Sequence, residues 1–286
     1  MTSEFFNTTR TGLAYNRYID HLTEEQLAAF DYIEVPFELL NFDPPVLERI
    51  NKKPLILHCA SLSLAGYVEP DAHIKERIGH FARLTHTPWI GEHLSFILAE
   101  KLDDQFYEEY APGEPYNIGY TVGPVMNAES VDHVIANVNR HAAVFGLPLI
   151  VENPPQYFPV PGSTMTQREF ICEIAKQSEI GLLLDLTHLF ISSQNMGFDA
   201  KKELLKYPLH RIKEVHVSGV NTAEGLHWDN HADTAPDIIF ELLDILMQHA
   251  RPAAITLEYN WSATFPWHLL SRELDRVQEI VHAYSS

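Results

Sequence analysis

Residues 181–188, GLLLDLTH, join a short apolar run to an Asp and then to a His, and this pattern decides the fold. The run is short and unbroken, which is typical of a strand buried on both faces of a parallel sheet. Seven other runs along the chain have the same character. We predict strands at Thr11–Tyr15, Tyr32–Val35, Leu55–His58, Trp89–His93, Leu149–Glu152, Gly181–Asp185, Lys213–Val217 and Ala254–Glu258.

Between these runs the apolar residues take up a helical spacing. They recur at i, i+4, i+7 and i+8 in one stretch and at i, i+3, i+4 and i+7 in another, which places one apolar stripe on one helix face. The two sets are Ile74, Ile78, Phe81 and Ala82, and Val131, Val134, Ile135 and Val138. Strands alternating with helices predict a single (β/α)8 TIM barrel, of the α/β class, over residues 1–286. An open doubly wound sheet is disfavoured because no glycine-rich phosphate-binding turn follows the first strand.

Composition limits the partners and the environment of this 286-residue chain. A formal net charge of −19 argues against nucleic acid and anionic membranes as partners, because both need clustered Lys and Arg. The only cysteines, Cys59 and Cys172, predict no disulfide framework and a reducing, cytoplasmic setting. Met1–Arg10 has no signal-peptide pattern, and no apolar run approaches the ~18–20 residues of a membrane helix. We predict a loop at Lys101–Pro115.

Six of the eight predicted strands end in a side chain that can bind a metal ion. These residues are His58, His93, Glu152, Asp185, His216 and Glu258. His188 follows Asp185 by three residues, and Asp229 and His231 lie in the loop after the seventh strand, where residues two apart can face the same way. The C-terminal ends of barrel strands meet at one mouth, where active sites are built. The sequence therefore predicts nine such side chains in one cavity, too many for a single ion.

Each of these residues alone also has an ordinary structural explanation. A single His at a strand end is more often a hydrogen-bonded structural residue, and an Asp or Glu there is often a helix N-cap. However, four buried carboxylates in one cavity would repel one another strongly, and the segments carry almost no Lys or Arg. Bound cations would neutralise them. We therefore predict a centre of two or three metal ions, in which Glu152 and Asp185 are the candidate bridging and catalytic carboxylates.

The other polar residues near these segments are interpreted as structural. His227 fits either a ligand or a structural role. Glu34 and Glu38 could orient ligand histidines or be ordinary polar residues of the barrel mouth, and the second interpretation is favoured. Cys59 should point away from His58 into the packed layer. Eight histidines in helical stretches are predicted to be surface or capping residues: His21, His73, His80, His133, His141, His249, His268 and His282.

Seven segments form an ordered set of motifs that spans nearly the whole chain. They are His58–Leu64 (HCASLSL), Gly91–Ser95 (GEHLS), Val151–Pro154 (VENP), Leu183–Asp185 (LLD), Asn195–Asp199 (NMGFD), Val215–Gly219 (VHVSG) and Leu257–Glu258 (LE). As a set they resemble the DUF692 family of multinuclear non-heme iron-dependent oxidases, which are MbnB-like enzymes. The resemblance implies a TIM barrel that holds two or three iron ions, Fe2+ and Fe3+ together.

What the family does is an expectation for this chain. The resemblance implies an oxidoreductase that uses dioxygen to modify a residue, often Cys, of a ribosomally made precursor peptide in natural-product biosynthesis. It also implies a small partner protein that binds the peptide leader. The implied metal ligands are His58, His93, Glu152, Asp185, His188, His216, Asp229, His231 and Glu258. His188 stands where many members have Asn, and the loop 229–232 is DNHA where many have DTHG.

Two other functions remain open at this point. Xylose-isomerase-like barrels gather the same residue types at their strand ends for sugar isomerisation or metal-assisted hydrolysis. A metal-binding protein without turnover is the third possibility. Mixed imidazole and carboxylate ligation suits iron, manganese or zinc. Metal analysis with a visible spectrum would therefore separate the three.

Overall fold

Eight parallel strands close into a barrel in the computed structural model, which describes residues 5–100, 113–260 and 266–284. The strands are β1 (Arg10–Ala14), β2 (Tyr32–Pro36), β3 (Leu55–Cys59), β4 (Ile90–His93), β7 (Leu149–Glu152), β8 (Gly181–Asp185), β9 (Ile212–Val217) and β12 (Ala254–Leu257). Their closed order is β1-β12-β9-β8-β7-β4-β3-β2, with every neighbour parallel. The predicted TIM barrel is confirmed. The strand bounds differ only at the ends, where Trp89 precedes β4 and Glu258 follows β12.

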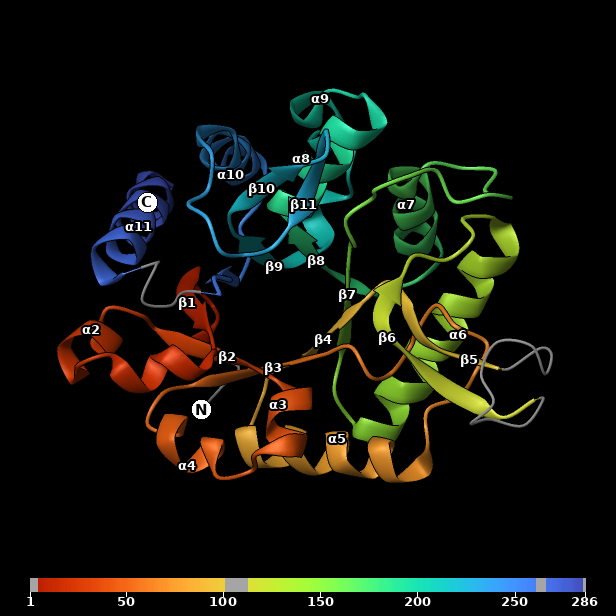
Figure 1. Ribbon diagram of the computed structural model, residues 1–286, viewed down its shortest axis with the longest axis horizontal. Coiled ribbons are helices and arrows are strands. Elements are labelled where there is room, and N and C mark those ends of the chain that lie inside the picture. The colour runs from red at the N-terminus through yellow and green to blue at the C-terminus, as the bar shows by residue number, and fades with distance from the viewer. Residues whose placement is uncertain (1–4, 101–112, 261–265, 285–286) are drawn as a thin grey trace.

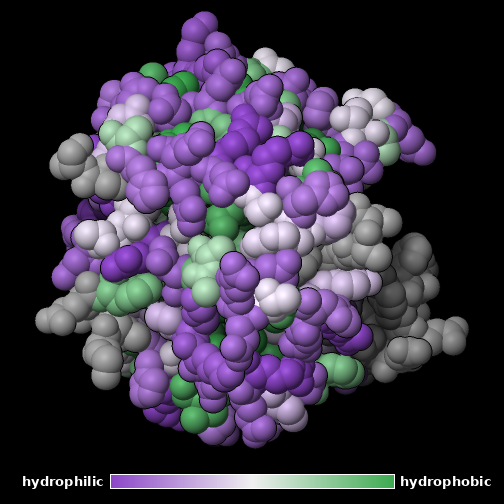
Figure 2. Space-filling model, turned by 90° about the vertical axis from the view of Figure 1, so that its left-hand side faces the viewer, coloured by the Kyte–Doolittle hydropathy of each residue, from purple (hydrophilic) through white to green (hydrophobic). Residues whose placement is uncertain are grey.

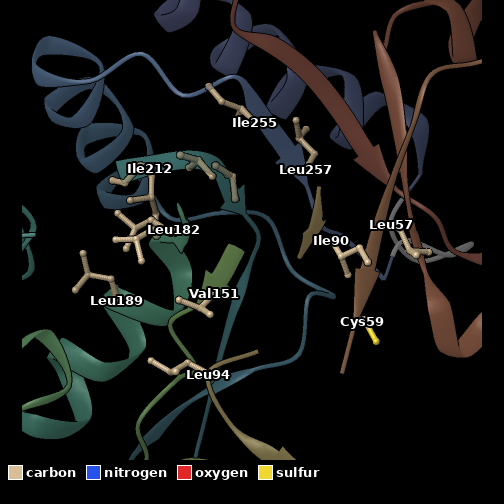
Figure 3. Packing of buried hydrophobic residues seen from close by; sticks show 14 of the residues in the cluster. Leu57, Cys59, Ile90, Leu94, Val151, Leu182, Leu189, Ile212, Ile255 and Leu257 are labelled. Atoms are coloured by element: carbon tan, nitrogen blue, oxygen red, sulfur yellow. The ribbon is translucent and has the colours of Figure 1, made fainter. Parts of the chain in front are cut away.

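The apolar runs form strands because both faces of this sheet are buried. Side chains alternate along a strand, so one set points to the helices and the other into the barrel. Leu57, Ile90 and Val151 belong to the outer layer of packed hydrophobic residues, which Figure 3 shows between strands and helices. Ile56 and Ile150, on the opposite faces of the same strands, pack inside the barrel. An unbroken apolar run therefore supplies hydrophobic side chains to both packed layers.

Helices surround the barrel, as Figure 1 shows. The longer ones are α5 (Ala72–Thr85), α6 (Ala128–Phe145), α7 (Gln167–Gln177), α8 (Leu186–Met196), α10 (Asp237–His249) and α11 (Trp267–Ala283). Shorter ones are α2 (Glu24–Ala28), α3 (Phe37–Phe42), α4 (Val46–Ile50), α9 (Ala200–Leu204), and the 3-10 helices η1 (Arg17–His21) and η2 (Leu209–Arg211). The two predicted stripes are confirmed, since Ile78 and Phe81 of α5 and Val134 of α6 are fully buried. Asn127 caps the start of α6, and Gly146 ends it in the left-handed conformation.

Two hairpins extend the barrel at its mouth. β5 (Phe96–Glu100) pairs with β6 (Pro115–Val122), and β10 (Val220–Ala223) pairs with β11 (Leu226–Asp229), both antiparallel. Neither hairpin was predicted from the sequence. The loop predicted at Lys101–Pro115 lies largely outside the described residues, and Pro115 itself begins β6. The second hairpin places Asp229 at the end of a strand instead of in an irregular loop.

The outer surface follows the sequence prediction in most places. Figure 2 shows the left-hand side of Figure 1, where α2 and α11 lie, as a mainly hydrophilic surface with scattered hydrophobic residues. Six of the eight histidines assigned to the surface are exposed. The assignment is wrong for His141, which is buried on α6, and for the half-buried His133, whose Nε2 lies 2.7 Å from the carbonyl oxygen of Gly66. Among the described residues, no helix is long and apolar enough to span a membrane.

Candidate metal centre

Six barrel-strand ends, helix α8 and the segment that ends the β10–β11 hairpin bring all nine predicted side chains close together. Their ligand atoms form three groups, within each of which the atoms lie no more than 4.8 Å apart. The groups are His58, His93 and Glu152; Glu152, Asp185, His216 and Glu258; and His188, Asp229 and His231. A fourth group joins Glu34, which was not a predicted ligand, to His58 and His216. Glu152 is shared by two of the three groups of predicted ligands and therefore links them.

Glu152, at the end of β7, directs its two carboxylate oxygens toward different histidines. Its Oε2 lies 3.3 Å from His58 Nε2 and 3.4 Å from His93 Nε2. Its Oε1 lies 3.4 Å from His188 Nδ1 and 3.6 Å from His216 Nδ1. Neither oxygen has a hydrogen-bond partner among the described residues, and burial raises the pKa of Glu152 to about 7. This geometry is suited to a carboxylate that bridges two ions.

Asp185 combines the end of β8 with the start of α8. Its Oδ1 accepts a hydrogen bond from the backbone N–H of His188 at 2.6 Å, which caps the helix, while Oδ2 has no partner among the described residues. The Nδ1 of His188 lies 2.9 Å from the carbonyl oxygen of Asn153, and a carbonyl only accepts, so Nδ1 carries the hydrogen. The Nε2 of His188 faces Asp229 Oδ2 at 3.0 Å. One oxygen of Asp185 therefore caps the helix, and the other is left free to bind an ion.

His216 is held between two carboxylates from different strands. Its Nε2 donates to Glu34 Oε2 on β2 at 3.0 Å, and its Nδ1 lies 3.0 Å from Glu258 Oε2. Burial lowers the pKa of His216, but Glu34 and Glu258 together raise it well above its usual value. The sequence favoured Glu34 as an ordinary polar residue of the barrel mouth. These contacts instead favour a role in orienting His216. Glu38 has a different role, since it accepts hydrogen bonds from the backbone of Ala60 after β3.

Gly91, Glu92 and His93 of β4 each have a different structural role. A Cβ on Gly91 would lie 2.7 Å from His58 Nδ1, so the ring of His58 leaves no room for a side chain there. Glu92 is fully buried and accepts hydrogen bonds from the backbone N–H groups of Leu62 and His93; burial raises its pKa well above the usual value. The sequence analysis did not single out Glu92. Strand alternation, which turns it away from its neighbour His93, could have found it.

Cys59 lies in the outer packed layer, as predicted. Its sulfur is 3.8 Å from Glu38 Oε1, and Figure 3 shows Cys59 in the same buried hydrophobic cluster as Leu57 and Ile90. Burial raises the pKa of its thiol well above the usual value. A neutral thiol that faces the helices is not a candidate ligand. His227, whose role was left open, packs against Phe190 and belongs to none of the four groups.

The third group lies where the β10–β11 hairpin ends. His231 Nε2 lies 3.0 Å from Asp229 Oδ2, and the backbone of His231 has a positive φ of 51°. Burial lowers the pKa of His231, but Glu258 and Asp229 raise it to about 9. Burial alone would raise the pKa of Asp229, but His188 and His231 outweigh this effect and hold the pKa below its usual value. The metal-free centre is therefore a dense set of mutually compensating charges.

The donor atoms fit metal ions. None of the four carboxylates of the three groups forms a salt bridge with Lys or Arg in the described part of the chain. Several buried carboxylate and imidazole atoms of the three groups have no hydrogen-bond partner among the described residues: both oxygens of Glu152, Asp185 Oδ2, Asp229 Oδ1, and the Nδ1 atoms of His58, His93 and His231. Buried polar atoms without partners are costly and need an explanation. A set of nitrogen and oxygen donors without thiolates suits iron, manganese or zinc.

Related proteins match along almost the entire barrel. The family model for the RiPP precursor modification enzymes MbnB/TglH/ChrH matches residues 10–282. A UPF0276 protein of Shewanella sediminis is 26% identical over 287 residues, which cover 97% of this chain and 96% of that protein. A UPF0276 protein of Rhizobium meliloti is 27% identical over 242 residues, which cover 82% of this chain and 72% of that protein.

Solved structures share the architecture at low sequence identity. The IOLI protein with a binding zinc atom has a TM-score of 0.56 at 14% identity, covering 97% of this chain and 99% of that one. Endonuclease IV from Thermus thermophilus has a TM-score of 0.56 at 12% identity, covering 96% of this chain and 99% of that one. These similarities show the fold alone. The family match, by contrast, spans all nine residues of the three groups, and the chain belongs to the MbnB/TglH/ChrH family of RiPP precursor modification enzymes.

Proposed function

We propose that this protein is a multinuclear non-heme iron-dependent oxidase that uses dioxygen to modify a residue, a Cys, of a ribosomally made precursor peptide. Family membership supports the peptide substrate, and the convergent imidazoles and carboxylates support the metal centre. The observation that carries the proposal is the placement of Glu152, whose two unbonded oxygens face separate pairs of histidines. A small partner protein that binds the peptide leader is part of the same proposal.

Each group of side chains would hold one ion, with Glu152 shared by two of them. The groups are His58, His93 and Glu152; Glu152, Asp185, His216 and Glu258; and His188, Asp229 and His231. Bound iron would supply one-electron chemistry with dioxygen and a binding position for a substrate thiolate. The protein fixes the rings before the ions arrive, because Asn153 holds the N–H of His188 and Glu34 holds an N–H of His216. Such partners set both ring orientation and basicity.

The centre is buried on one side and partly open on the other. The side chains of Asp185 and His216 are completely buried, whereas those of His93 and Glu258 are 21% and 27% exposed. We therefore expect the peptide residue to approach from the side of His93 and Glu258. The packed interior below excludes water, so the reacting groups would meet in a largely dry site.

Iron-dependent and oxygen-dependent peptide oxidation tests this proposal. The protein is loaded with Fe2+ without oxygen, its metal content is measured, and a Cys-containing precursor peptide is added. We expect two or three irons per chain, a visible thiolate-to-iron band on adding peptide, and a change in peptide mass that needs both iron and dioxygen. Peptide turnover with zinc or manganese in the absence of dioxygen would contradict it, as would isomerisation of a sugar. The solved epimerase-like structures share the fold alone and do not favour a sugar substrate.

A further inference from the structure

A column of polar side chains fills the barrel interior directly below the candidate metal centre. TIM barrels usually fill these layers with branched apolar residues. The column consists of Tyr32, Glu34, Trp89, Glu214 and Thr256, none of which is more than 8% exposed. Tyr32 and Trp89 also pack in the apolar layer beneath, with Ile56, Ile150, Leu183 and Ala254. Two carboxyl groups thus lie between the metal ligands and the apolar floor of the barrel.

Thr256, on β12, is the junction of this column. Its Oγ1 lies 2.9 Å from Glu214 Oε1, 3.1 Å from Glu34 Oε2 and 2.7 Å from the hydroxyl of Tyr32. One hydroxyl hydrogen cannot serve both carboxyl groups, so the position of the threonine couples the two. The ring of Tyr32 is itself fixed, because it fills the space that a Cβ on Gly12 would occupy. The junction therefore has little freedom to move.

The column ends on a metal ligand at the top and on an indole at the bottom. Glu34 accepts a hydrogen bond from His216 Nε2 at 3.0 Å, with its Oε1 4.0 Å from His58 Nδ1. Trp89 Nε1 donates to Glu214 Oε2 at 2.8 Å. These contacts thus link the floor of the barrel to the ring of His216 through Glu214, Thr256 and Glu34.

This arrangement is costly, which argues for a role beyond stability. Burying two carboxyl groups side by side is unfavourable, and apolar residues of similar volume often pack more stably than a buried ionic network. Of the two carboxyl groups, Glu34 is the one that accepts a hydrogen bond from the ring of His216.

We propose that Thr256 and Glu214 are positioning residues that act through Glu34 to fix the ring of His216 and set how strongly its Nδ1 binds metal. The inference rests on the proposed metal centre but not on the identity of the reaction. Carboxylates that accept the N–H of a ligand histidine raise its basicity, and their removal typically costs about 10- to 100-fold in metal affinity. Residues that hold such a carboxylate should act in the same direction with a smaller effect.

Titration of the metal-free protein with Co2+ tests this role without turnover. The visible band reports the ligands of Co2+, and a competing chelator gives its affinity. In Glu34→Gln we expect the same number of bound Co2+ ions, about 10- to 100-fold weaker affinity and a shifted band. Thr256→Val should change both properties in the same direction but less, and Thr256→Ser should restore them. The matched control is Thr85→Val, which removes a buried hydroxyl bonded to a carbonyl of α5 far from the centre.

Each outcome separates this inference from the proposed function. A band and an affinity like those of the wild type in both Glu34→Gln and Thr256→Val would overturn the positioning role. Loss of one Co2+ equivalent in Glu34→Gln would also overturn it, because Glu34 would then be a ligand. A wild-type protein that binds no Co2+ would instead refute the metal centre itself. If Thr256→Val does not fold, Tyr32→Phe removes only the hydroxyl that contacts Thr256, and an unchanged band there would overturn the role.

Discussion

Replacing Glu152 by Gln separates metal binding from folding, because the two effects have opposite signs. The substitution keeps the shape but removes the charge that faces four histidines. Since Glu152 belongs to two of the metal groups, we expect the variant to lose at least one metal equivalent and its oxidase activity. The barrel should persist, because its stability depends mainly on the apolar layers.

The metal-free variant should be at least as stable as the wild type. Burial raises the pKa of Glu152 from 4.5 to about 7, and a pKa difference of one unit corresponds to ~1.4 kcal/mol. A carboxyl group with a raised folded-state pKa loses stability as pH rises from its unfolded-state pKa to its folded-state pKa. Above pH 7 the ionised group therefore costs on the order of 1–3 kcal/mol, which Gln avoids.

Iron content after Fe2+ loading and urea unfolding of the metal-free proteins at pH 5 and pH 8 measure the two effects. Glu203→Gln, which removes a carboxylate paired with Arg168 on the outside of the barrel, is the control and should keep its iron. Full iron content and full peptide turnover in Glu152→Gln would refute the reasoning. The carboxylate ligands of the centre would then be Asp185, Asp229 and Glu258. A variant that fails to fold would instead make Glu152 a structural carboxylate.

Three further predictions follow from local geometry. Gly91→Ala would place a Cβ 2.7 Å from His58 Nδ1, so metal content should fall while circular dichroism still shows the barrel; unchanged metal content would contradict this. Gly12→Ala would drive a Cβ into the ring of Tyr32 and should lower the free energy of unfolding, measured in urea, by ~1–3 kcal/mol. Although burial lowers it, the neighbouring carboxylates raise the pKa of His231 to about 9. Since metal binding displaces such protons, Zn2+ affinity measured by calorimetry should rise with pH up to about 9, and a flat profile would contradict this.

The barrel could be predicted because its strands are buried on both faces. Leu149–Glu152 and Gly181–Asp185 have the same bounds in the prediction and in the structure, since a polar or charged side chain ends each apolar run. The hairpins could not be predicted from the same signal. β6 is mostly exposed and carries an irregularity opposite Phe96 and Leu98, so it has no continuous apolar run or regular alternation. Strands that lie on the surface leave little trace in hydrophobic periodicity.

The convergence of the candidate ligands at strand ends could be predicted, because the topology of a closed parallel barrel brings the C-terminal strand ends together. The interior column could not, because its contacts join residues far apart in sequence, such as Glu34 and His216. One signal was available for part of it. Glu214 lies two residues before His216 on β9 and therefore faces the same interior, as alternation along a strand requires. The role of Glu34, however, depends on which strand lies opposite, and only the closed barrel shows that.

The number and coupling of the metal ions test the central claim most directly. Protein produced with isotope-enriched iron and purified without oxygen can be examined by elemental analysis and Mössbauer spectroscopy together. The account predicts two or three irons per chain, of which at least two are magnetically coupled through a shared carboxylate. A single mononuclear iron, or no bound metal in metal-replete protein, would contradict it.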